Sequence, residues 1–363
     1  MVKGMLKIFC VLIGVLVAFI SLIRGFVFFY PSIGKIPNKE RREKYAKKSD
    51  LYYEDKFHNI EDTIVKEPKY GSTKSHEVVP TKKIPVGNIK KFPKPQKNKV
   101  TITWLGHSSI MIQMDKKNIL IDPVLTKYAS PFGFIGVKRF NESPIKLEDV
   151  PIIDVLLISH DHYDHLDYKT IKKIDNKVKK YVVPLGIESY LEGWGVDGEK
   201  ITILNWWEDE KIDNLLVTSV PARHYSMRNP FKDRVTLWSG FLLRSDDVSI
   251  YFTGDTGYTT TFREVGKRFG HIDVLMADSG QYNSAWREVH MGPYDALQAA
   301  VDVNAKYYIP VHWGSFALSN HNWFDPAEIA TANQDEYGVK VITPRIGEMV
   351  DMAEIDLYTN KWW

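Results

Sequence analysis

The sequence predicts a mixed α/β domain preceded by a membrane-spanning segment. Short apolar runs, each long enough for one buried strand, recur from residue 100 to residue 311, and helical patterns lie at 261–269, 294–303 and 326–333. A separate apolar run near the N-terminus is too long for a strand. With 363 residues, of which 44% are hydrophobic, the chain is long enough to build a large core.

Composition excludes several classes of protein and site. The chain holds one cysteine, Cys10, so an intrachain disulfide and a zinc site built from cysteines are both excluded. The formal net charge of +3 is too small to indicate nucleic-acid binding, and no strongly basic groove with aromatic residues stands out. We therefore expect no nucleic-acid partner.

The N-terminal run predicts a single-pass membrane anchor over residues 1–30. Residues 8–23 are uncharged and almost wholly apolar, and Arg24 lies close enough to the end of the run to reach the interface. A helix needs about 20 residues to cross the hydrocarbon core. Lys3 and Lys7 would also suit a cleaved signal peptide, but no small-x-small cleavage pattern follows. We therefore expect an uncleaved anchor in the cell membrane.

The cations on either side of the anchor predict its orientation. Lys3, Lys7 and the amino terminus precede the apolar run, whereas a larger group follows it: Arg24, Lys35, Lys39, Arg41, Arg42, Lys44, Lys47 and Lys48. Because positively charged flanks tend to stay in the cytoplasm, we expect the downstream domain on the cytoplasmic side. The same cations would attract anionic lipid headgroups.

Residues 31–98 form a basic juxtamembrane segment that has two interpretations. The segment is polar and rich in lysine, and prolines at 80, 85, 93 and 95 discourage long elements. A plain tether is one interpretation. The other is a strap packed on the following domain, because residues 51–53 and Phe57 offer apolar surface. In both cases residues 99–363 form the main folded domain.

Within this domain, strand-like runs come first. Residues 100–104, 109–114 and 118–121 are separated by short turns and predict the first strands. Further apolar runs predict strands at 154–158, 180–183, 200–203, 215–220, 238–244, 248–252, 273–277 and 307–311. Pro293 and Asp295 suit the first turn of the helix at 294–303. Periodicity alone therefore supports a mixed α/β domain and no finer class.

A cluster of metal-ligand residues follows the apolar run 155–158. His160, His162, Asp164 and His165 stand within six residues, at the end of a predicted strand. Neutral imidazole and carboxylate are ligands that zinc prefers. In a tight turn, His160 and His162 would converge on one ion, while Asp164 and His165 would face a second ion beside it. The alternative is a solvated polar loop, which so dense a set of ligand residues disfavours.

Three further candidate ligands follow apolar runs elsewhere in the chain, namely His224, Asp255 and His312. Four ligands in one loop cannot complete two coordination spheres, so other segments must contribute. The ends of neighbouring strands meet at one rim of a sheet, where residues far apart in the sequence can converge. Any one of the three alone would more often be an ordinary histidine or turn aspartate. Their common position after strands favours ligation.

The sequence H-D-H-Y-D-H at 160–165 resembles the signature of the metallo-β-lactamase superfamily of binuclear hydrolases. Other segments narrow the resemblance to N-acyl phosphatidylethanolamine-hydrolysing phospholipase D and its bacterial relatives. These segments are 104–107, 122–123, 206–208, 254–258 and 312–314. The similarity runs from about residue 100 to about residue 325, with a weaker match at 49–59.

The resemblance implies a fold and an activity that periodicity does not supply. The fold would be an αββα sandwich, in which two sheets pack face to face between outer helices. The weaker match at 49–59 favours a strap partly packed on the domain over a plain tether. The shared chemistry of the superfamily is hydrolysis, so the resemblance predicts a metal-dependent hydrolase.

The family pattern also assigns the ligands. It implies His160, His162 and His224 on one ion, Asp164, His165 and His312 on the other, and Asp255 as the bridge between them. Two Zn²⁺ ions are the natural choice for these side chains, although Mn²⁺ or Fe²⁺ would also accept them. In the iron-dependent oxidoreductases of this fold a glutamate usually stands where this chain has His162, so the sequence departs from that group.

Other residues match family site positions or lie beside the ligands. Asp164, Tyr163 and His290 are the predicted catalytic residues, with His290 and Tyr163 available for substrate contact or proton transfer. Asp122 follows a predicted strand and is interpreted as a residue that orients a liganding imidazole. His107 is interpreted as shaping a turn or supporting a ligand, rather than binding metal itself.

The narrower resemblance predicts a membrane-anchored phosphodiesterase that converts N-acyl phosphatidylethanolamine-type phospholipids to an N-acylethanolamine and phosphatidic acid. The expected partners are a phospholipid substrate and the membrane, and family enzymes can also form homodimers. Two alternatives remain open. One is a hydrolase of another ester, such as a lactone or a soluble phosphodiester. The other is a non-catalytic, membrane-tethered module with a structural metal.

The segment 128–140 also suits a membrane-associated enzyme. It is apolar, broken by glycines and ends in cations, as expected of a lip that dips into the headgroup region. Phe132, Phe134 and Ile135 are the predicted membrane or substrate contacts. The alternative interpretation is a loop whose apolar residues are buried in the core.

Overall fold

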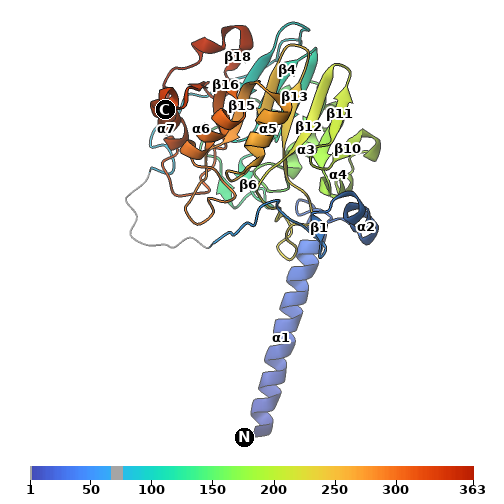
Figure 1. Cartoon of the computed structure of the whole chain (residues 1–363). Coiled ribbons are helices and arrows are strands. Elements are labelled where there is room, and N and C mark those ends of the chain that lie inside the picture. The colour runs from blue at the N-terminus through green and yellow to red at the C-terminus, as the bar shows by residue number, and fades with distance from the viewer. Residues whose placement is uncertain (1, 67–76) are drawn as a thin grey trace.

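The computed structural model describes residues 2–66 and 77–363, and it consists of two large sheets between two layers of helices (Figure 1). The first sheet has the order β10 (Ile201–Leu204), β9 (Val178–Pro184), β8 (Ile153–Leu157), β5 (Lys117–Ile121), β4 (Ile110–Met114), β3 (Thr101–Trp104) and β18 (Met349–Asp351). The second has the order β11 (Asp209–Ile212), β12 (Leu215–Pro221), β13 (Ser239–Arg244), β14 (Ser249–Phe252), β15 (Ile272–Asp278), β16 (Ala305–Val311) and β17 (Lys340–Val341).

Helices cover the outer face of each sheet. The first sheet packs against α3 (Tyr168–Ile174) and α4 (Ile187–Gly193), and the second against α5 (Thr261–Phe269), α6 (Pro293–Asp302) and α7 (Asp325–Tyr337). Alternation along β8 shows the layers: Val155 and Leu157 point into the core between the sheets, whereas Leu156 points toward α3 and α4. The predicted αββα sandwich is therefore confirmed.

Every strand predicted from an apolar run overlaps an observed strand, and all three predicted helices are present. The strands that the sequence did not indicate are short or polar. β11 reads Asp-Glu-Lys-Ile and lies at a sheet edge, where charged residues discourage pairing with other chains. β17 and β18 contain two and three residues. α7 runs beyond its predicted end at 333 and stops before Gly338, whose left-handed φ of 63° suits glycine.

Strand direction brings several chain segments to one rim. β5 and β8 run parallel, as do β14, β15 and β16, and β12 runs in the same direction as β14 because both pair antiparallel with β13. Asp122 follows β5, His224 follows β12, Asp255 follows β14 and His312 follows β16. All four residues therefore lie at the C-terminal ends of strands, where α/β proteins build their sites.

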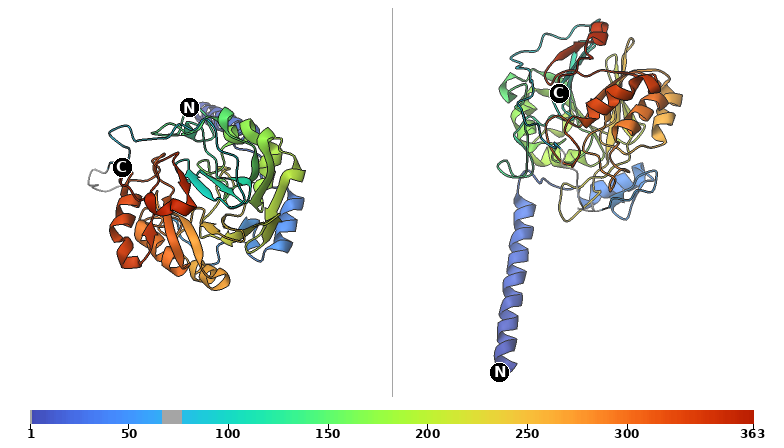
Figure 2. Two further views of the ribbon diagram at one scale, coloured as in Figure 1. Left: turned by 90° about the horizontal axis from the view of Figure 1, so that it is seen from above. Right: turned by 90° about the vertical axis from the view of Figure 1, so that its left-hand side faces the viewer.

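The N-terminal helix α1 (Val2–Phe29) projects from one end of the globular domain (Figures 1 and 2). Its segment Lys7–Val27 is long and apolar enough to cross a membrane, and the side chains described between Lys7 and Arg24 are exposed. An exposed apolar surface of this length suits lipid rather than water. This segment is a candidate membrane anchor.

The juxtamembrane strap packs on the domain through part of its length. It contains α2 (Lys39–Lys48) and the hairpin of β1 (Tyr52–Tyr53) and β2 (Lys56–Phe57), and residues 67–76 of it lie outside the described residues. Tyr45, Tyr52 and Phe57 are buried in one apolar cluster with Leu185, Trp206, Leu237 and Trp238 of the domain. A second small hairpin, β6 (Tyr128–Ala129) with β7 (Val137–Lys138), lies near the end of α1 (Figure 1).

Candidate metal centre

The loop between β8 and α3 carries the predicted metal-ligand motif. The backbone N–H groups of His165 and Leu166 donate to the carbonyl oxygen of His162 at 3.1 and 2.9 Å, which closes a tight turn. The backbone N–H of Ser159 donates to Asp122 Oδ1 at 2.7 Å and fixes the start of the loop. The turn buries His165 while His162 remains partly exposed.

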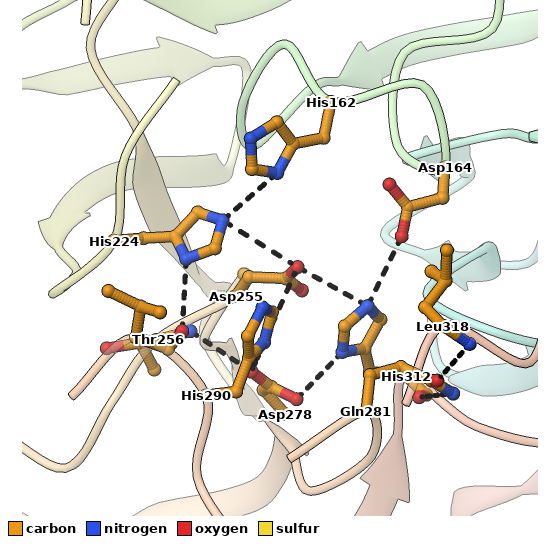
Figure 3. Close-up of polar contacts among 12 residues, drawn as sticks. His162, Asp164, His224, Asp255, Thr256, Asp278, Gln281, His290, His312 and Leu318 are labelled. Atoms are coloured by element: carbon orange, nitrogen blue, oxygen red, sulfur yellow. Dashed lines mark hydrogen bonds and ion pairs between the residues drawn. The ribbon is translucent and has the colours of Figure 1, made fainter. Parts of the chain in front are cut away.

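His160, His162 and His224 bring three ring nitrogens together. His162 Nδ1 lies 3.1 Å from His160 Nε2 and 3.2 Å from His224 Nε2. Asp255 Oδ2 lies 3.7 Å from His160 Nε2 and 3.9 Å from His224 Nε2. The four side chains, brought from three chain segments, form one group of ligand atoms. Figure 3 shows three of them, His162, His224 and Asp255.

Asp164, His165 and His312 form a second group beside the first. Asp164 Oδ2 lies 3.5 Å from His165 Nε2 and 3.3 Å from His312 Nε2. Asp255 Oδ2 lies 3.1 Å from His165 Nε2 and 3.3 Å from His312 Nε2. The same oxygen of Asp255 therefore faces both groups, which is the position of a bridging ligand.

The donor set and its spacing fit a pair of zinc ions. A tetrahedral site with metal–ligand bonds of ~2.0–2.1 Å has edges of ~3.3 Å, close to the separations of 3.1–3.9 Å in the two groups. His165 Nε2 and Asp255 Oδ1 are buried and make no hydrogen bond within the described part of the chain. Buried polar atoms without partners are costly, so these atoms favour a bound cation.

Each buried ligand imidazole is held from behind through its second nitrogen. The contacts to Nδ1 are Ser159 Oγ for His160 at 2.9 Å, Asp122 Oδ2 for His165 at 2.8 Å, Val289 O for His224 at 3.0 Å and Asp278 Oδ1 for His312 at 2.9 Å. Such contacts fix the ring orientation and leave Nε2 available to a metal. Asp122 lies where an orienting residue is expected.

His107 both shapes a turn and supports a ligand, which are the two roles that its sequence context suggested. It adopts a left-handed φ of 56°, and its backbone pairs with that of Trp313. Its Nε2 atom lies 2.8 Å from Asp164 Oδ2. Burial, together with the charge of His312, lowers the pKa of His107 to about 4. The neutral imidazole donates to Asp164 and supports that carboxylate.

The two groups differ in their electrostatics. Burial alone would raise the pKa values of Asp164 and Asp255, but His165 and other imidazoles hold both values well below their usual range. Burial lowers the pKa of His312, but Asp255 and Asp278 outweigh it and raise the pKa to about 10. In the first group, burial lowers the pKa of His160. The imidazole pKa is therefore lowered for His160 in the first group and raised for His312 in the second.

A cavity of about 350 Å³ opens over both groups. His162, Asp164, Asp255 and His312 line its floor. The walls are largely apolar and include Val65, Ala129, Tyr225, Trp286, Val289 and Leu318. A mostly apolar pocket with a few convergent polar groups is the usual form of a small-molecule site.

The structure places His290 and Tyr163 differently with respect to this cavity, although both line it. His290 Nδ1 lies 2.9 Å from Asp278 Oδ2, and its ring stacks on that of His312 at 5.1 Å (Figure 3). This contact leaves Nε2 for a substrate. The hydroxyl of Tyr163 instead donates to the carbonyl oxygen of Arg228 at 2.9 Å. Proton transfer therefore fits His290 better than Tyr163.

The lip segment is exposed at its tip and packed at its base. Phe134 and Ile135 have 74% and 59% of their surface accessible, so the interpretation as buried core does not describe them. Phe132 packs on the end of α1, with its ring 6.0 Å from that of Phe26 and 5.2 Å from that of Tyr30. The base of the lip therefore packs against the end of the candidate anchor.

Sequence reasoning missed three residues that support the site. Asp278 contacts two site histidines. Its position directly after the predicted strand 273–277 could have indicated it as a site residue. Asn59 of the strap exchanges hydrogen bonds with the backbone of His224 at 2.9 and 3.1 Å. Arg228 is buried and donates to the carbonyl oxygens of Asp161 and Leu166 in the ligand loop.

Comparison with known proteins agrees with this geometry. Residues 117–313 match the Beta-lactamase superfamily domain. The chain is 30% identical over 313 residues to an N-acyl-phosphatidylethanolamine-hydrolyzing phospholipase D of Caenorhabditis elegans, covering 82% of this chain and 88% of the relative. It is 36% identical over 271 residues to an uncharacterized protein of Mycobacterium tuberculosis, covering 73% and 72%.

Among solved structures, a metallo hydrolase from the hyperthermophilic archaeon Ignicoccus hospitalis matches with a TM-score of 0.56 at 21% identity, covering 70% of this chain and 98% of that one. This likeness supports the fold. The family match covers more than half of the chain, and the ligand residues converge as the fold requires. The chain therefore belongs to the metallo-β-lactamase superfamily and is a metal-dependent hydrolase.

Proposed function

We propose that the protein is a membrane-anchored binuclear zinc phosphodiesterase. Its substrates would be N-acyl phosphatidylethanolamine-type phospholipids, and its products an N-acylethanolamine and phosphatidic acid. The observation that carries the proposal is the position of Asp255 Oδ2, which lies 3.1 Å from His165 Nε2 and 3.7 Å from His160 Nε2 in the two ligand groups. The similarity to a phospholipase D with this substrate in its name supports the substrate class.

A pair of metal ions in these groups would stabilise phosphoryl charge and make water ionisable near neutral pH. The chain's own residues hold the ligands and the substrate. Asp278 and Asp122 fix the rings of His312 and His165. His290, held by Asp278, presents Nε2 as the nitrogen for the leaving alcohol, where a positioned imidazole can transfer a proton.

The surroundings of the cavity suit a substrate that stays in a bilayer. Ala129 in the wall belongs to the β6–β7 hairpin, and the same lip carries the exposed Phe134 and Ile135. Leu318, in another wall, is also exposed. If α1 spans the membrane, the apolar lip beside it would bring the mouth of the cavity near the lipid surface.

Purified full-length protein in vesicles containing N-acyl phosphatidylethanolamine tests the proposal. We expect about two zinc ions per chain by metal analysis and both products by mass spectrometry. His224→Ala should lose metal and at least about 100-fold in turnover. His271→Ala is the matched control, because His271 is half exposed and lies 3.6 Å from Asp273 away from the site.

The outcomes separate the alternatives. Hydrolysis of lactones or water-soluble diesters without hydrolysis of the phospholipid would favour the other-ester hydrolase. Bound metal with no turnover of any diester would favour a non-catalytic module tethered to the membrane. Either result would overturn the proposed phospholipase activity.

We also propose that the domain faces the cytoplasm, and the family resemblance allows a homodimer. The cations at Lys35, Lys39 and Arg41, close behind the apolar helix, support the orientation. Protection of the domain from protease in inside-out vesicles would contradict it. Sedimentation of the detergent-solubilised protein as a monomer would contradict the dimer.

A further inference from the structure

A second cavity, distinct from the one over the ligand groups, lies where α1 joins the domain. It measures about 160 Å³ and is lined by three chain segments. These are residues 30–32 after α1, residues between 126 and 133 just before and within the lip, and residues 167–169 at the start of α3. If α1 spans a bilayer as proposed, residues 30–32 lie at the level of the lipid headgroups.

The wall formed by residues 30–32 is fixed to the domain. Trp194 Nε1 donates to the carbonyl oxygen of Pro31 at 2.7 Å. Arg228 Nε and Nη2 donate to the carbonyl oxygen of Ser32 at 2.9 and 2.6 Å. The hydroxyl of Ser32 in turn donates to the carbonyl oxygen of Pro131 in the lip. The cavity therefore has preformed walls.

The cavity offers donors that have no partner in the described part of the chain. The Lys169 ammonium makes no hydrogen bond or ion pair with any residue in 2–66 or 77–363, and neither do the hydroxyls of Tyr30, Tyr128 and Tyr168. The one carboxylate in the wall, Asp167, is engaged in capping α3, where it accepts from the backbone and hydroxyl of Thr170 at 3.1 and 2.6 Å.

Lys169 is placed against the lip. A Cβ atom added at Gly133 would lie 1.7 Å from Lys169 Nζ, so the ammonium occupies the space that a side chain would need there. Lys127, just before the lip, and Lys138 within it are exposed and make no ion pair in the described part of the chain. The local charge is therefore positive around an ammonium that is open to a ligand.

We propose that this junction cavity binds the phosphate of an anionic phospholipid from the surrounding bilayer. Lys169 would supply the charge, and the tyrosine hydroxyls would supply hydrogen bonds. The inference rests on the membrane anchor of the proposed function but not on the hydrolysis. Because Arg228 also donates to the ligand loop through Asp161, a lipid held here would fix the loop relative to the membrane surface.

The test measures lipid retention by the full-length protein. Protein would be extracted from nanodiscs of phosphatidylcholine with or without phosphatidylglycerol, and bound lipid counted by native mass spectrometry. We expect wild type to retain phosphatidylglycerol and Lys169→Ala to retain about fivefold less. Lys173→Ala is the matched control, since Lys173 is an exposed cation of the same helix that lies 3.6 Å from Glu148.

A second variant keeps the test independent of the lysine itself. Gly133→Ala places a methyl group where the ammonium of Lys169 stands, so it should reduce retention to a similar extent. Turnover of a water-soluble diester should be unchanged in all three variants, whether or not N-acyl phosphatidylethanolamine is the substrate.

Equal retention by wild type and Lys169→Ala would overturn the proposal. Equal loss in Lys173→Ala would also overturn it, because the effect would then be general surface charge. Displacement of phosphatidylglycerol by soluble glycerophosphate at equal concentration would reject a lipid ligand in favour of a soluble phosphate. Selective loss in Lys169→Ala and Gly133→Ala, without such displacement, would support it.

Discussion

The carboxylate of Asp278 lies 2.9 Å from Nδ1 of His312, at the end of the neighbouring parallel strand. Its other oxygen lies 2.9 Å from Nδ1 of His290. One buried carboxylate therefore holds a predicted metal ligand and a predicted substrate-contacting histidine at a fixed separation. The backbone N–H of Thr256 donates to Asp278 at 3.2 Å and ties the carboxylate to the turn that carries Asp255.

Replacing Asp278 by Asn should weaken metal binding by about 10- to 100-fold, because a neutral amide is a poorer acceptor for the Nδ1–H of His312. Competition with a chromophoric chelator measures this affinity. Asp273→Asn is the matched control, since Asp273 lies on the same strand but accepts from Ser249, far from the ligands. Unchanged affinity in Asp278→Asn would show that the strand alone holds His312.

The metal-free protein should lose stability as the pH rises above neutrality. Although burial lowers the pKa of His312, Asp255 and Asp278 raise it to about 10, above the ordinary 6.5. The stabilisation from the protonated ring is therefore complete below pH 6.5 and is lost as the pH approaches 10. His165, whose pKa is also raised, acts in the same direction.

Metal binding should remove this alkaline loss, because a bound ion replaces the protons on His165 and His312. Thermal unfolding of chelator-treated and zinc-reloaded protein, from about pH 7 to about pH 9, measures the difference in melting temperature. We expect the difference in melting temperature between the zinc-reloaded and the metal-free protein to increase with rising pH. A constant difference would mean that these histidines are neutral in the metal-free protein.

The exposed tip of the lip should matter for bilayer substrates only. Replacing Phe134 and Ile135 by Ser removes apolar surface that contacts no core, so stability should change by less than about 0.5 kcal/mol. Activity on phospholipid vesicles should fall several-fold, while turnover of a soluble diester stays the same. Phe132→Ser should also loosen the end of α1, because Phe132 packs on Phe26 and Tyr30. Equal losses of activity on both substrates would argue against a membrane-specific role of the lip.

The ligands could be predicted from the sequence because each set lies within a few residues after an apolar run, and strand ends are visible in such runs. His224, Asp255 and His312 shared that signal, which is why residues far apart in the sequence could be grouped. Periodicity alone indicated a mixed α/β domain, the family resemblance implied the αββα sandwich, and the order of the strands in the two sheets came only with the structure.

The supporting contacts could not be predicted, because they depend on sheet register and on chain segments far away. Asp161 stands in the ligand motif, yet its carboxylate accepts from the backbone of Met227 and the hydroxyl of Tyr190 and faces away from the ligand groups. Nothing in the motif distinguishes Asp161 from Asp164. Asn59 is similar, since its contact with His224 spans 165 positions and depends on how the strap packs.

Arg228 links Ser32, which follows the candidate anchor α1, to the ligand loop, and its replacement should affect both stability and metal content. The side chain is 1% exposed, and its guanidinium donates to the carbonyl oxygens of Ser32, Asp161 and Leu166. It also stacks on the ring of Tyr163, with Cζ 4.3 Å from the centroid. Arg228→Gln replaces the guanidinium by one shorter amide group, which cannot donate to all three buried oxygens, so we expect a loss of at least about 3 kcal/mol.

Urea unfolding of the metal-free protein measures that loss, and metal analysis after reloading measures the effect on the loop. Arg228→Lys keeps the charge but cannot reach three acceptors with a planar fork, so its stability should lie between those of wild type and Arg228→Gln. Arg268→Gln is the control, because Arg268 is half exposed and pairs with Glu264 on the surface of α5. If Arg228→Gln unfolded like wild type and bound metal equally well, the anchor and the ligand loop would be independent. The hydrogen bonds through which Arg228 connects Ser32 with the loop would then contribute nothing to metal binding, because the loop would keep its ligands in place without them.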